Sequence, residues 1–508
     1  MLQTKDYRRF RVGDVEFEGA QLAGKALPGD TVILEDRKVS GILRRAEHKQ
    51  IVGTLELASK MRYGLTSRAH PIFLFTPFSE SYPPFYVGCA RKDLSRNVIA
   101  SIDFNNWDDG TCPRGNLVHI FGTAGSLDVE EEALTFHSSP FRWKKLEDLV
   151  EPELLVPQVD GVTFHIDPPG CRDIDDAITL YKLNGVETKV SIHIADVASW
   201  LRLNPSLIKT AKAISQTLYM DGIAIRPMFP IELSEGKFSL LPGEYRRVVT
   251  LSFIWDTTRK KMDTPLWKIE MIRVSKSFTY DSVASSIFAK DLTEICSGIA
   301  GREVTDSHEW IEQLMILYNC QAATMLHSAG LGVLRRHAGI YKERFESYKA
   351  LGLPADRLAM VAGEYCEATA NDFSHWGLQK PVYCHATSPI RRWSDCVNQI
   401  ILQDIIENRI SNITDLHDDI LYMNIRSKAV KAYERDLLFL RAILNPVKKV
   451  LDGVIAEAGR VWIPVWDRVV KTNTKNIESG ANVRIKYYCD PTKRSWKRRL
   501  VLDVTRYT

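Results

Sequence analysis

Four aspartates fall within ten residues of the 508-residue chain: Asp167, Asp173, Asp175 and Asp176. The turn Pro168-Pro169-Gly170 folds Asp167 back toward the other three, between apolar stretches at 162–166 and 177–181. Carboxylates this close repel one another unless cations neutralise them. Because Mg²⁺ prefers oxygen ligands, the cluster predicts metal-assisted phosphodiester hydrolysis, in which one ion activates water and a second stabilises the leaving oxygen.

The aspartates alone leave two other interpretations of this segment. Most Asp-rich loops are solvated acidic turns, and nothing in the spacing excludes that reading by itself. A calcium-binding loop is the second alternative. The EF-hand spacing is not met, because the required glycine and terminal glutamate are out of register.

A turn rich in arginine, Thr387-Ser388-Pro389-Ile390-Arg391-Arg392-Trp393, is the second candidate site. Ser388 is a natural N-cap and Pro389 suits the first helical position, so we predict that a helix begins here. Its core-facing stripe would be Ile390, Trp393, Val397 and Ile401. Arg391 lies off that stripe, and two arginines beside free backbone N–H groups favour phosphate binding. The alternative is that they pair with carboxylates such as Asp395.

The elements that must position these groups change along the chain. Residues 1–140 contain short strands separated by turns, which is typical of small β-barrels. Strands dominate from about 159 to 255, and a helical periodicity follows from about 308 to 445. After Pro446 the pattern returns to strands, with a basic turn at 493–499. Both candidate sites therefore fall in a mixed α/β body between β-rich ends.

Composition is that of an ordinary globular protein. There are 67 Lys and Arg against 63 Asp and Glu, and 45% of the residues are hydrophobic. This balance excludes intrinsic disorder. No apolar run approaches the roughly 18 residues needed to cross a bilayer, and the basic first residues lack the apolar core of a secretory signal. We therefore expect no membrane partner.

The nine cysteines are scattered and form no CxxC pair. Without a secretory signal, this pattern predicts reduced thiols and a cytoplasmic location, with a nuclear one as the alternative. Cys384 and His385 are adjacent, but sequence neighbours rarely form a nucleophile pair. We expect a buried thiol at Cys384.

Six sequence blocks follow one another through the middle of the chain: 166–177 (IDPPGCRDIDDA), 193–197, 218–234, 334–337 (LRRH), 375–378 (HWGL) and 385–393 (HATSPIRRW). In composition and order they resemble the RNB-family exoribonucleases. This family includes bacterial RNase II and RNase R and the catalytic subunit of the eukaryotic exosome.

The resemblance implies an α+β multidomain fold, with an RNB catalytic α/β body flanked by N-terminal cold-shock (OB) β-barrels and a C-terminal OB-type β-barrel. The implied domains are a reduced first cold-shock-like region (1–43), a second cold-shock domain (44–140), the RNB catalytic domain (141–449) and a C-terminal OB-type RNA-binding domain (450–508). We expect no PIN endonuclease domain before the first cold-shock-like region, and therefore exonuclease activity alone. The reduced first region predicts an altered entry channel.

By resemblance, the activity is processive 3′-to-5′ hydrolysis of single-stranded RNA to nucleoside 5′-monophosphates. The implied cofactor is Mg²⁺, as one or two ions for which Mn²⁺ can substitute, held by Asp167, Asp173, Asp175 and Asp176. The implied catalytic residues are Asp175, Asp176 and Arg391. Loss of Asp175 should abolish hydrolysis and spare binding, while Arg391 would stabilise charge on the scissile phosphate.

The resemblance also implies six RNA-binding residues: Tyr219, Arg391, Arg392, Glu434, Lys493 and Arg494. Tyr219 matches the aromatic residue that stacks on the terminal bases, with a buried strand tyrosine as the alternative. Glu434 looks like a glutamate near the 3′ nucleotide, although an ion pair with Lys431 or Arg435 explains it nearly as well. The basic turn that holds Lys493 and Arg494 also resembles a nuclear signal.

The alternative function is a catalytically inactive RNB-like protein that binds RNA as a regulator. Such proteins lose the acidic quartet or the arginine, and all five residues are present here. A DNA-directed nuclease would keep the carboxylates, but we expect RNA with a free 3′ end, because the family contacts the 2′-hydroxyl. We expect a monomer, and docking on an exosome-like ring stays open.

The net charge of +4 conceals an uneven distribution. Residues 426–508 contain 19 Lys and Arg against 8 Asp and Glu, so this segment carries +11 and the rest of the chain −7. The basic excess lies where the resemblance places an RNA-binding surface, which would make binding dependent on salt. Near-neutrality therefore does not exclude a nucleic-acid partner.

Overall fold

The computed structural model describes residues 1–508 apart from 109, 145, 147, 157–159, 414, 445–449, 473, 475, 490–499 and 507–508. The chain forms two compact units. Unit 1 contains Met1–Pro140, Ser347–Leu353 and Ala432–Thr508, and unit 2 contains Phe141–Glu346 and Pro354–Lys431. No helix among the described residues is long and apolar enough to cross a membrane.

The N-terminal part of unit 1 contains a closed β-barrel with the strand order β10-β8-β7-β6-β9. Its strands are β6 (Ile51–Leu55), β7 (Ile72–Pro77), β8 (Phe85–Gly88), β9 (Val98–Asn106) and β10 (Arg114–Thr123). Phe73, Phe75, Phe85 and Val87 are buried inside it. The prediction of a small barrel from short strands is confirmed.

Shorter elements surround this barrel. The antiparallel strands β1 (Leu2–Thr4), β2 (Arg9–Val12) and β3 (Val15–Glu18) form one sheet, and β4 (Thr31–Glu35) and β5 (Lys38–Arg44) form a hairpin. The 3₁₀ turn η1 (Ala20–Ala23) connects them. Helix α1 (Leu127–Ser138) packs on the barrel, where Ala133 is buried against Val52 and Ile99.

The C-terminal part of unit 1 is a five-stranded antiparallel sheet with the order β24-β23-β22-β25-β26. Its elements are β22 (Val450–Glu457), β23 (Arg460–Ile463), the 3₁₀ turn η4 (Pro464–Trp466), β24 (Arg468–Lys471), β25 (Asn482–Cys489) and β26 (Leu500–Arg506). Strand β23 ends at Ile463, because the next residue, Pro464, lacks the N–H that a ladder needs. Among the described residues this sheet is an open half-barrel.

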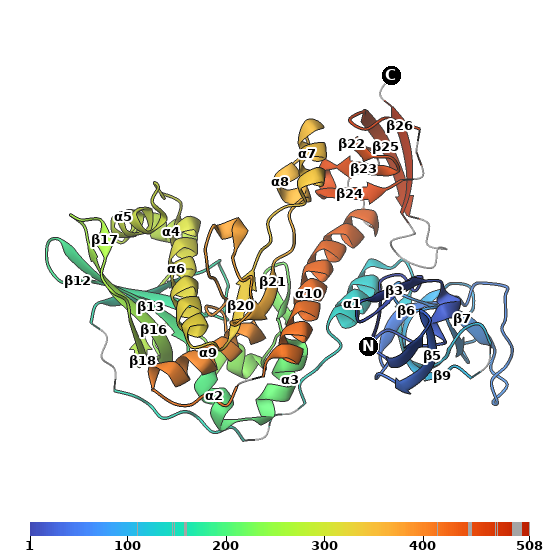
Figure 1. The fold of residues 1–508 in the computed structure, drawn as a ribbon, viewed down its shortest axis with the longest axis horizontal. Helices are drawn as coiled ribbons and strands as arrows, with labels where there is room; N and C mark the ends of the chain where they lie inside the picture. Colours follow the sequence, from blue (N-terminus) through green and yellow to red (C-terminus); the bar gives the residue numbers. More distant parts are fainter. Residues whose placement is uncertain are drawn as a thin grey trace. The chain divides into compact units, whose positions relative to one another are not determined.

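Unit 2 is built on a seven-stranded sheet with the order β17-β16-β13-β12-β11-β19, in which β18 also pairs with β16. The strands are β11 (Val162–Ile166), β12 (Asp176–Lys182), β13 (Glu187–Ala195), β16 (Tyr245–Asp256), β17 (Lys261–Met262), β18 (Leu266–Arg273) and β19 (Lys276–Phe278). Ile178, Ile192 and Leu251 belong to its apolar core. In Figure 1, β12, β13, β16 and β18 lie side by side with α6 next to them.

Helices and two hairpins complete unit 2. The helices are α2 (Val197–Leu203), α3 (Ser206–Ile214), α4 (Tyr280–Ala284), α5 (Ala289–Ala300), α6 (Ser307–Ser328), α7 (Lys342–Ala350), α8 (Ala355–Leu358), α9 (Trp393–Ile406) and α10 (His417–Leu444), and α7 and α10 continue into unit 1. The hairpins are β14 (Leu218–Met220) with β15 (Ile223–Arg226), and β20 (Val333–Arg336) with β21 (Glu364–Glu367). Short π- and 3₁₀-helical turns are η2 (Leu233–Lys237) and η3 (Trp376–Leu378).

The predicted helical region from 308 to 445 is confirmed in α6, α9 and α10, but the prediction is wrong where β20 and β21 interrupt it. Helix α6 stops before Gly332, which has φ of +100°, and the chain then enters β20. Cys384, bridged to β20 at Leu334, is buried, and its thiol donates to the carbonyl of Asn319 at 3.3 Å. The expected buried thiol is therefore confirmed.

Candidate active site

The four aspartates lie in the loop that joins β11 to β12. Strand β11 ends at Ile166 and β12 begins at Asp176, so the two ends of this antiparallel pair bring Asp167 and Asp176 to the same edge of the sheet. Gly170 has φ of +83°, a conformation that favours glycine. The predicted fold-back of the loop is thus observed.

Asp175 contacts the arginine turn, although the two segments are far apart in sequence. The backbone N–H of Ile390 donates to Oδ1 of Asp175 at 2.9 Å, and Nε of Arg391 donates to Oδ2 at 3.1 Å. Arg391 also donates from Nη2 to the hydroxyl of Ser388 at 3.0 Å. The Asp175 side chain is 4% exposed, whereas that of Arg391 is 43% exposed. The guanidinium is therefore anchored on one side and open on the other.

Burial disfavours the ionised forms of the carboxylates in this cluster. It raises the pKa of Asp175 to about 7, against the opposing effects of Arg391 and the Ile390 N–H. Burial and the charges of Asp167 and Asp175 together raise the pKa of Asp176 well above its ordinary value. One arginine does not offset these carboxylates, so a bound cation would stabilise their ionised forms.

Tyr219 also lies beside the acidic loop. It belongs to β14 and is half-buried, and its hydroxyl donates to Oδ2 of Asp173. Burial raises the pKa of Tyr219, as does the charge of Asp173. The predicted RNA-binding tyrosine and a predicted metal ligand are thus joined directly, and the stacking of Tyr219 on RNA bases stays a prediction.

His165 is a site residue that the sequence patterns did not reveal. Its Nδ1 hydrogen-bonds to Oδ2 of Asp167 at 2.9 Å, and the residue is 5% exposed. The buried Nε2 has no partner among the described residues. A strand places residues i and i+2 on one face, so the spacing of His165 and Asp167 was the available signal.

The residues suit Mg²⁺ by their chemistry. Asp167, Asp173 and Asp176 supply only oxygen donors, and the raised pKa of Asp176 marks a need for positive charge. In the described part of the chain, however, no three His, Cys, Asp or Glu side chains are gathered into a metal-binding group. The Mg²⁺ ligand set therefore stays a prediction.

The predicted helix start at Ser388 is wrong. Helix α9 begins at Trp393, with Arg392 as its N-cap in an extended conformation. Arg392 forms a β-bridge with Gln216, and the N–H of Trp393 donates to the carbonyl of Ser215 at 2.8 Å. These contacts hold Arg392 extended, so the preceding residues form a turn that carries Arg391. The predicted core-facing residues Ile390, Trp393, Val397 and Ile401 are buried.

Asp395 holds this turn together. Its buried carboxylate accepts from the N–H of Ser388 at 2.8 Å, from Nη2 of Arg392 at 2.8 Å and from the hydroxyl of Ser394 at 2.9 Å. The ion-pair alternative is therefore observed for Arg392, whose role in RNA binding stays a prediction. Arg391 also pairs with a carboxylate, that of Asp175, so the same alternative is observed for it and its contact with a phosphate stays a prediction.

The remaining predicted RNA-binding residues are Glu434, Lys493 and Arg494. Glu434 is exposed on α10 and belongs to unit 1, so its proposed contact with the 3′ nucleotide stays a prediction. Lys493 and Arg494 lie outside the described residues.

The acidic loop and the arginine turn both lie in regions that match a known family model. Residues 158–296 and 355–408 match the family model described as the RNB domain. The chain therefore contains a region that matches the RNB domain, as its sequence blocks indicate.

The chain is similar in sequence to proteins that are described as exonucleases. The chain is 24% identical over 463 residues to "Exosome complex exonuclease dis3" of Schizosaccharomyces pombe, covering 70% of this chain and 47% of that protein. It spans about half the length of the curated relatives it matches first.

Two solved structures share its fold. Mycoplasma genitalium RNase R, in complex with ribose-methylated single-stranded RNA, superposes with a TM-score of 0.76 at 16% identity, and the alignment covers 99% of each chain. Yeast Ssd1, described as a pseudonuclease, superposes with a TM-score of 0.70 at 15% identity, covering 96% of this chain and 81% of that one. At these identities the likeness establishes the fold alone.

Proposed function

We propose that this protein is a 3′-to-5′ exoribonuclease that hydrolyses single-stranded RNA to nucleoside 5′-monophosphates with Mg²⁺. The observation that carries the proposal is the contact of Asp175 with both Arg391 and the Ile390 N–H, inside an RNB domain whose acidic quartet is intact. Similarity to the exosome exonuclease dis3 supports it.

Each group of the site has a role in this proposal. Asp167, Asp173, Asp175 and Asp176 would hold Mg²⁺, which when bound supplies an activated water and neutralises charge on the phosphate. Arg391, fixed by Asp175 and half-exposed, directs its free N–H groups toward the scissile phosphate and stabilises its developing charge. Tyr219, whose hydroxyl is held by Asp173, offers its ring to the terminal base.

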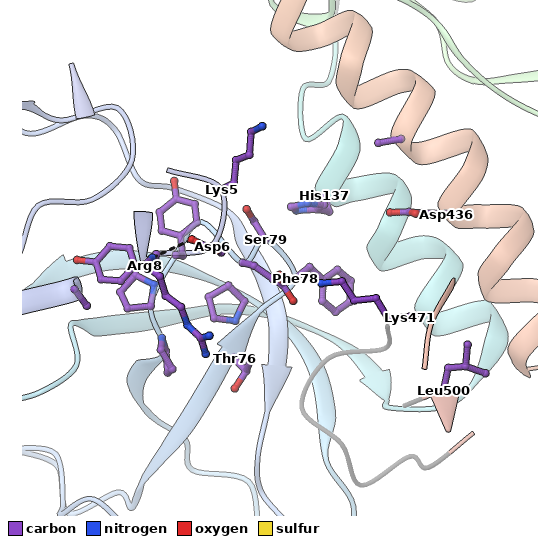
Figure 2. A pocket seen from close by; sticks show the side chains of 18 of the residues that line it. Lys5, Asp6, Arg8, Thr76, Phe78, Ser79, His137, Asp436, Lys471 and Leu500 are labelled. Carbon is purple, nitrogen blue, oxygen red and sulfur yellow. Dashed lines mark hydrogen bonds between the residues drawn. The ribbon is translucent and has the colours of Figure 1, made fainter. Parts of the chain in front are cut away.

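A cavity in unit 1 supports a nucleic-acid substrate. It has a volume of about 1720 Å³, and its lining includes Lys5, Arg8, Lys25 and Lys471. Figure 2 shows Lys5, Asp6 and Arg8 on one side of this cavity and Lys471 with Leu500 on the other. Basic side chains with neighbouring aromatic rings, here Tyr7 and Trp107, suit a single-stranded polynucleotide.

The test compares a 5′-labelled RNA incubated with wild type and with Asp175→Asn in the presence of Mg²⁺. We expect wild type to shorten the RNA from its 3′ end, and Asp175→Asn to bind RNA without shortening it. The matched control is Asp404→Asn, because the Asp404 side chain is also 4% exposed and accepts from Nε of Arg409 at 3.1 Å, away from the acidic loop. Folded wild type that leaves RNA intact with Mg²⁺ or Mn²⁺ would overturn the proposal.

An inactive RNA-binding regulator is the second candidate, because the Ssd1 fold neighbour is described as a pseudonuclease. The same experiment separates the two functions. RNA that is bound tightly and released intact by every variant, including wild type, favours the regulator.

A further inference from the structure

Unit 2 contains a second group of hydrogen-bond donors where β20 pairs with β21. Arg335 faces Tyr365 across this hairpin, and its guanidinium carbon lies 4.5 Å from the centre of the Tyr365 ring. Arg335 is 5% exposed, and its Nη1 is buried without a hydrogen-bond partner among the described residues. A buried guanidinium is normally paired with an anion, so this arginine indicates a missing anionic partner.

Two histidines add donors of defined tautomer. The rings of His337 and His375 stack with centroids 5.3 Å apart. Nδ1 of His337 accepts from the N–H of Gly339 at 3.3 Å, and Nδ1 of His375 accepts from the N–H of Leu378 at 3.2 Å. Because a nitrogen that accepts carries no proton, each neutral ring holds its proton on Nε2. Burial lowers the pKa of His375 to about 4, so this ring is neutral at neutral pH.

An exposed tryptophan lies next to these donors. Trp376 is 53% exposed, and its ring lies 6.1 Å from that of His337 at an angle of 23°. Gly339 has φ of +96°, and a Cβ on it would approach Cγ of Trp376 to 3.3 Å. The indole is thus held against the backbone with much of its surface open. Such a ring beside phosphate-binding groups suits a nucleotide.

Tyr365, which contacts Arg335, is joined by hydrogen bonds to the turn that carries Arg391. The Tyr365 hydroxyl hydrogen-bonds Nδ1 of His385 at 2.9 Å and lies 3.1 Å from the hydroxyl of Ser394. The Ser394 hydroxyl donates its single proton to Asp395, which also accepts from the N–H of Ser388. Because Arg391 donates to the Ser388 hydroxyl, a chain of contacts connects Arg335 to the proposed catalytic arginine.

We propose that Arg335, His337 and His375 bind a backbone phosphate of the RNA other than the scissile one, and that Trp376 stacks on the adjacent base. This subsite rests on the proposed function for the identity of its ligand. It predicts that the two contacts differ in kind, since the phosphate contact depends on salt and the stacking contact does so only weakly.

The test is fluorescence anisotropy of a labelled single-stranded RNA in EDTA, with its length checked on a gel, at several salt concentrations. We expect Trp376→Ala to weaken binding about tenfold with an unchanged salt slope. Arg335→Gln should weaken binding and reduce the slope of log K against log salt by about 0.7, which is the loss of one phosphate contact. If Arg335→Gln fails to fold, His375→Phe tests the same phosphate contact. This variant keeps the ring stack and removes the Nε2–H donor, so it should weaken RNA binding.

The matched control is Tyr181→Ala, which removes another exposed aromatic ring of unit 2, on β12, and should leave binding unchanged. Wild-type affinity in Trp376→Ala and His375→Phe would overturn the subsite. The subsite would also be overturned if inorganic phosphate abolished RNA binding equally in wild type and Trp376→Ala. That result would indicate a site for a simple anion. All of these measurements report RNA binding and need no cleavage. If the protein cleaves no RNA but shows these changes in affinity, the proposed hydrolysis is contradicted and the subsite is supported.

Discussion

Arg391 donates from Nε to Oδ2 of Asp175 at 3.1 Å, and this ion pair joins residues 216 positions apart. One partner lies in the acidic loop between β11 and β12, and the other in the turn before α9. The pair leaves much of the guanidinium exposed, since the Arg391 side chain is 43% accessible. The ion pair therefore holds the Arg391 guanidinium beside the carboxylates and leaves some of its N–H groups available for other hydrogen bonds.

The geometry of this guanidinium should matter more than its charge. Arg391→Lys keeps the charge and loses the fork that reaches Asp175 and Ser388 at once. We expect the single-turnover cleavage rate to fall by about 10²–10³-fold, the usual effect of removing one donor that stabilises a transition state. RNA affinity should change much less.

The chain offers a close control for that substitution. Arg409 is 44% exposed and its Nε contacts the 4% exposed Asp404 at the same 3.1 Å. Arg409→Lys should cleave at the wild-type rate. Equal losses in the two variants would show that breaking a buried ion pair, and not chemistry at the phosphate, explains the effect.

The hydroxyl and the ring of Tyr219 should have separable roles. Tyr219→Phe removes the donor to Asp173, and we expect cleavage to slow by about 10- to 150-fold, since a hydrogen bond to a charged group contributes roughly 1.5–3 kcal/mol. The length of the final product should not change. Tyr219→Ala also removes the ring and should leave a longer final product, as measured on a denaturing gel.

A tyrosine outside the site tests the specificity of this result. Tyr422 is half-buried and its hydroxyl donates to the carbonyl of Ala213 at 2.7 Å. Tyr422→Phe should match wild type in rate and product length. Identical product lengths for Tyr219→Ala and wild type would contradict the stacking role.

The aspartate cluster and several strands could be predicted from short stretches of sequence. The aspartate cluster is visible because its members are neighbours in sequence and the Pro-Pro-Gly turn folds them together. The strands at Ile51 and Val190 follow from apolar runs bounded by turns. The resemblance implied that Asp175 and Arg391 are both catalytic residues, but the contact between them could not be predicted, because it depends on how β12 and α9 pack.

The helix start failed for a physical reason of the same kind. Ser388 and Pro389 have strong local preferences for a helix N-terminus, but Arg392 pairs with Gln216 as a β-bridge and Asp395 accepts the Ser388 N–H. These tertiary contacts override the local preference. His165 escaped notice because its i, i+2 spacing from Asp167 is common in strands and does not by itself indicate a contact.

That contact suggests a role in metal binding. His165→Phe would keep the buried volume and release Oδ2 of Asp167 from its hydrogen bond. If His165 orients a ligand, the Mg²⁺ concentration for half-maximal cleavage should rise about 10- to 100-fold, the usual cost of losing an outer-shell partner. Saturating Mg²⁺ should restore the rate. A lower rate at every Mg²⁺ concentration with an unchanged midpoint would contradict this role.

A separate buried ion pair makes the stability of unit 1 dependent on pH. Asp30 is fully buried and pairs with Arg45 at 2.6 Å and with His48 at 2.8 Å. Burial alone would raise the pKa of Asp30, but His48, the N–H groups of Leu27 and Ala46, and Arg45 hold it below the ordinary value of 3.8. These interactions link the β4–β5 region to the segment that leads into the barrel.

Because the folded-state pKa of Asp30 is lowered, its ionised form stabilises the fold above pH 3.8, and this stabilisation is lost as pH falls through the folded-state pKa. Asp30→Asn should therefore lower the free energy of unfolding at neutral pH by roughly 3–5 kcal/mol, since it leaves buried partners without their anion. The difference from wild type should shrink below pH 4, as measured by denaturant unfolding across pH. Asp93→Asn, which changes a fully exposed carboxylate, should have little effect at any pH. A deficit in Asp30→Asn that is constant from pH 7 down to pH 3 would mean that packing, and not the ionised carboxylate, stabilises this region.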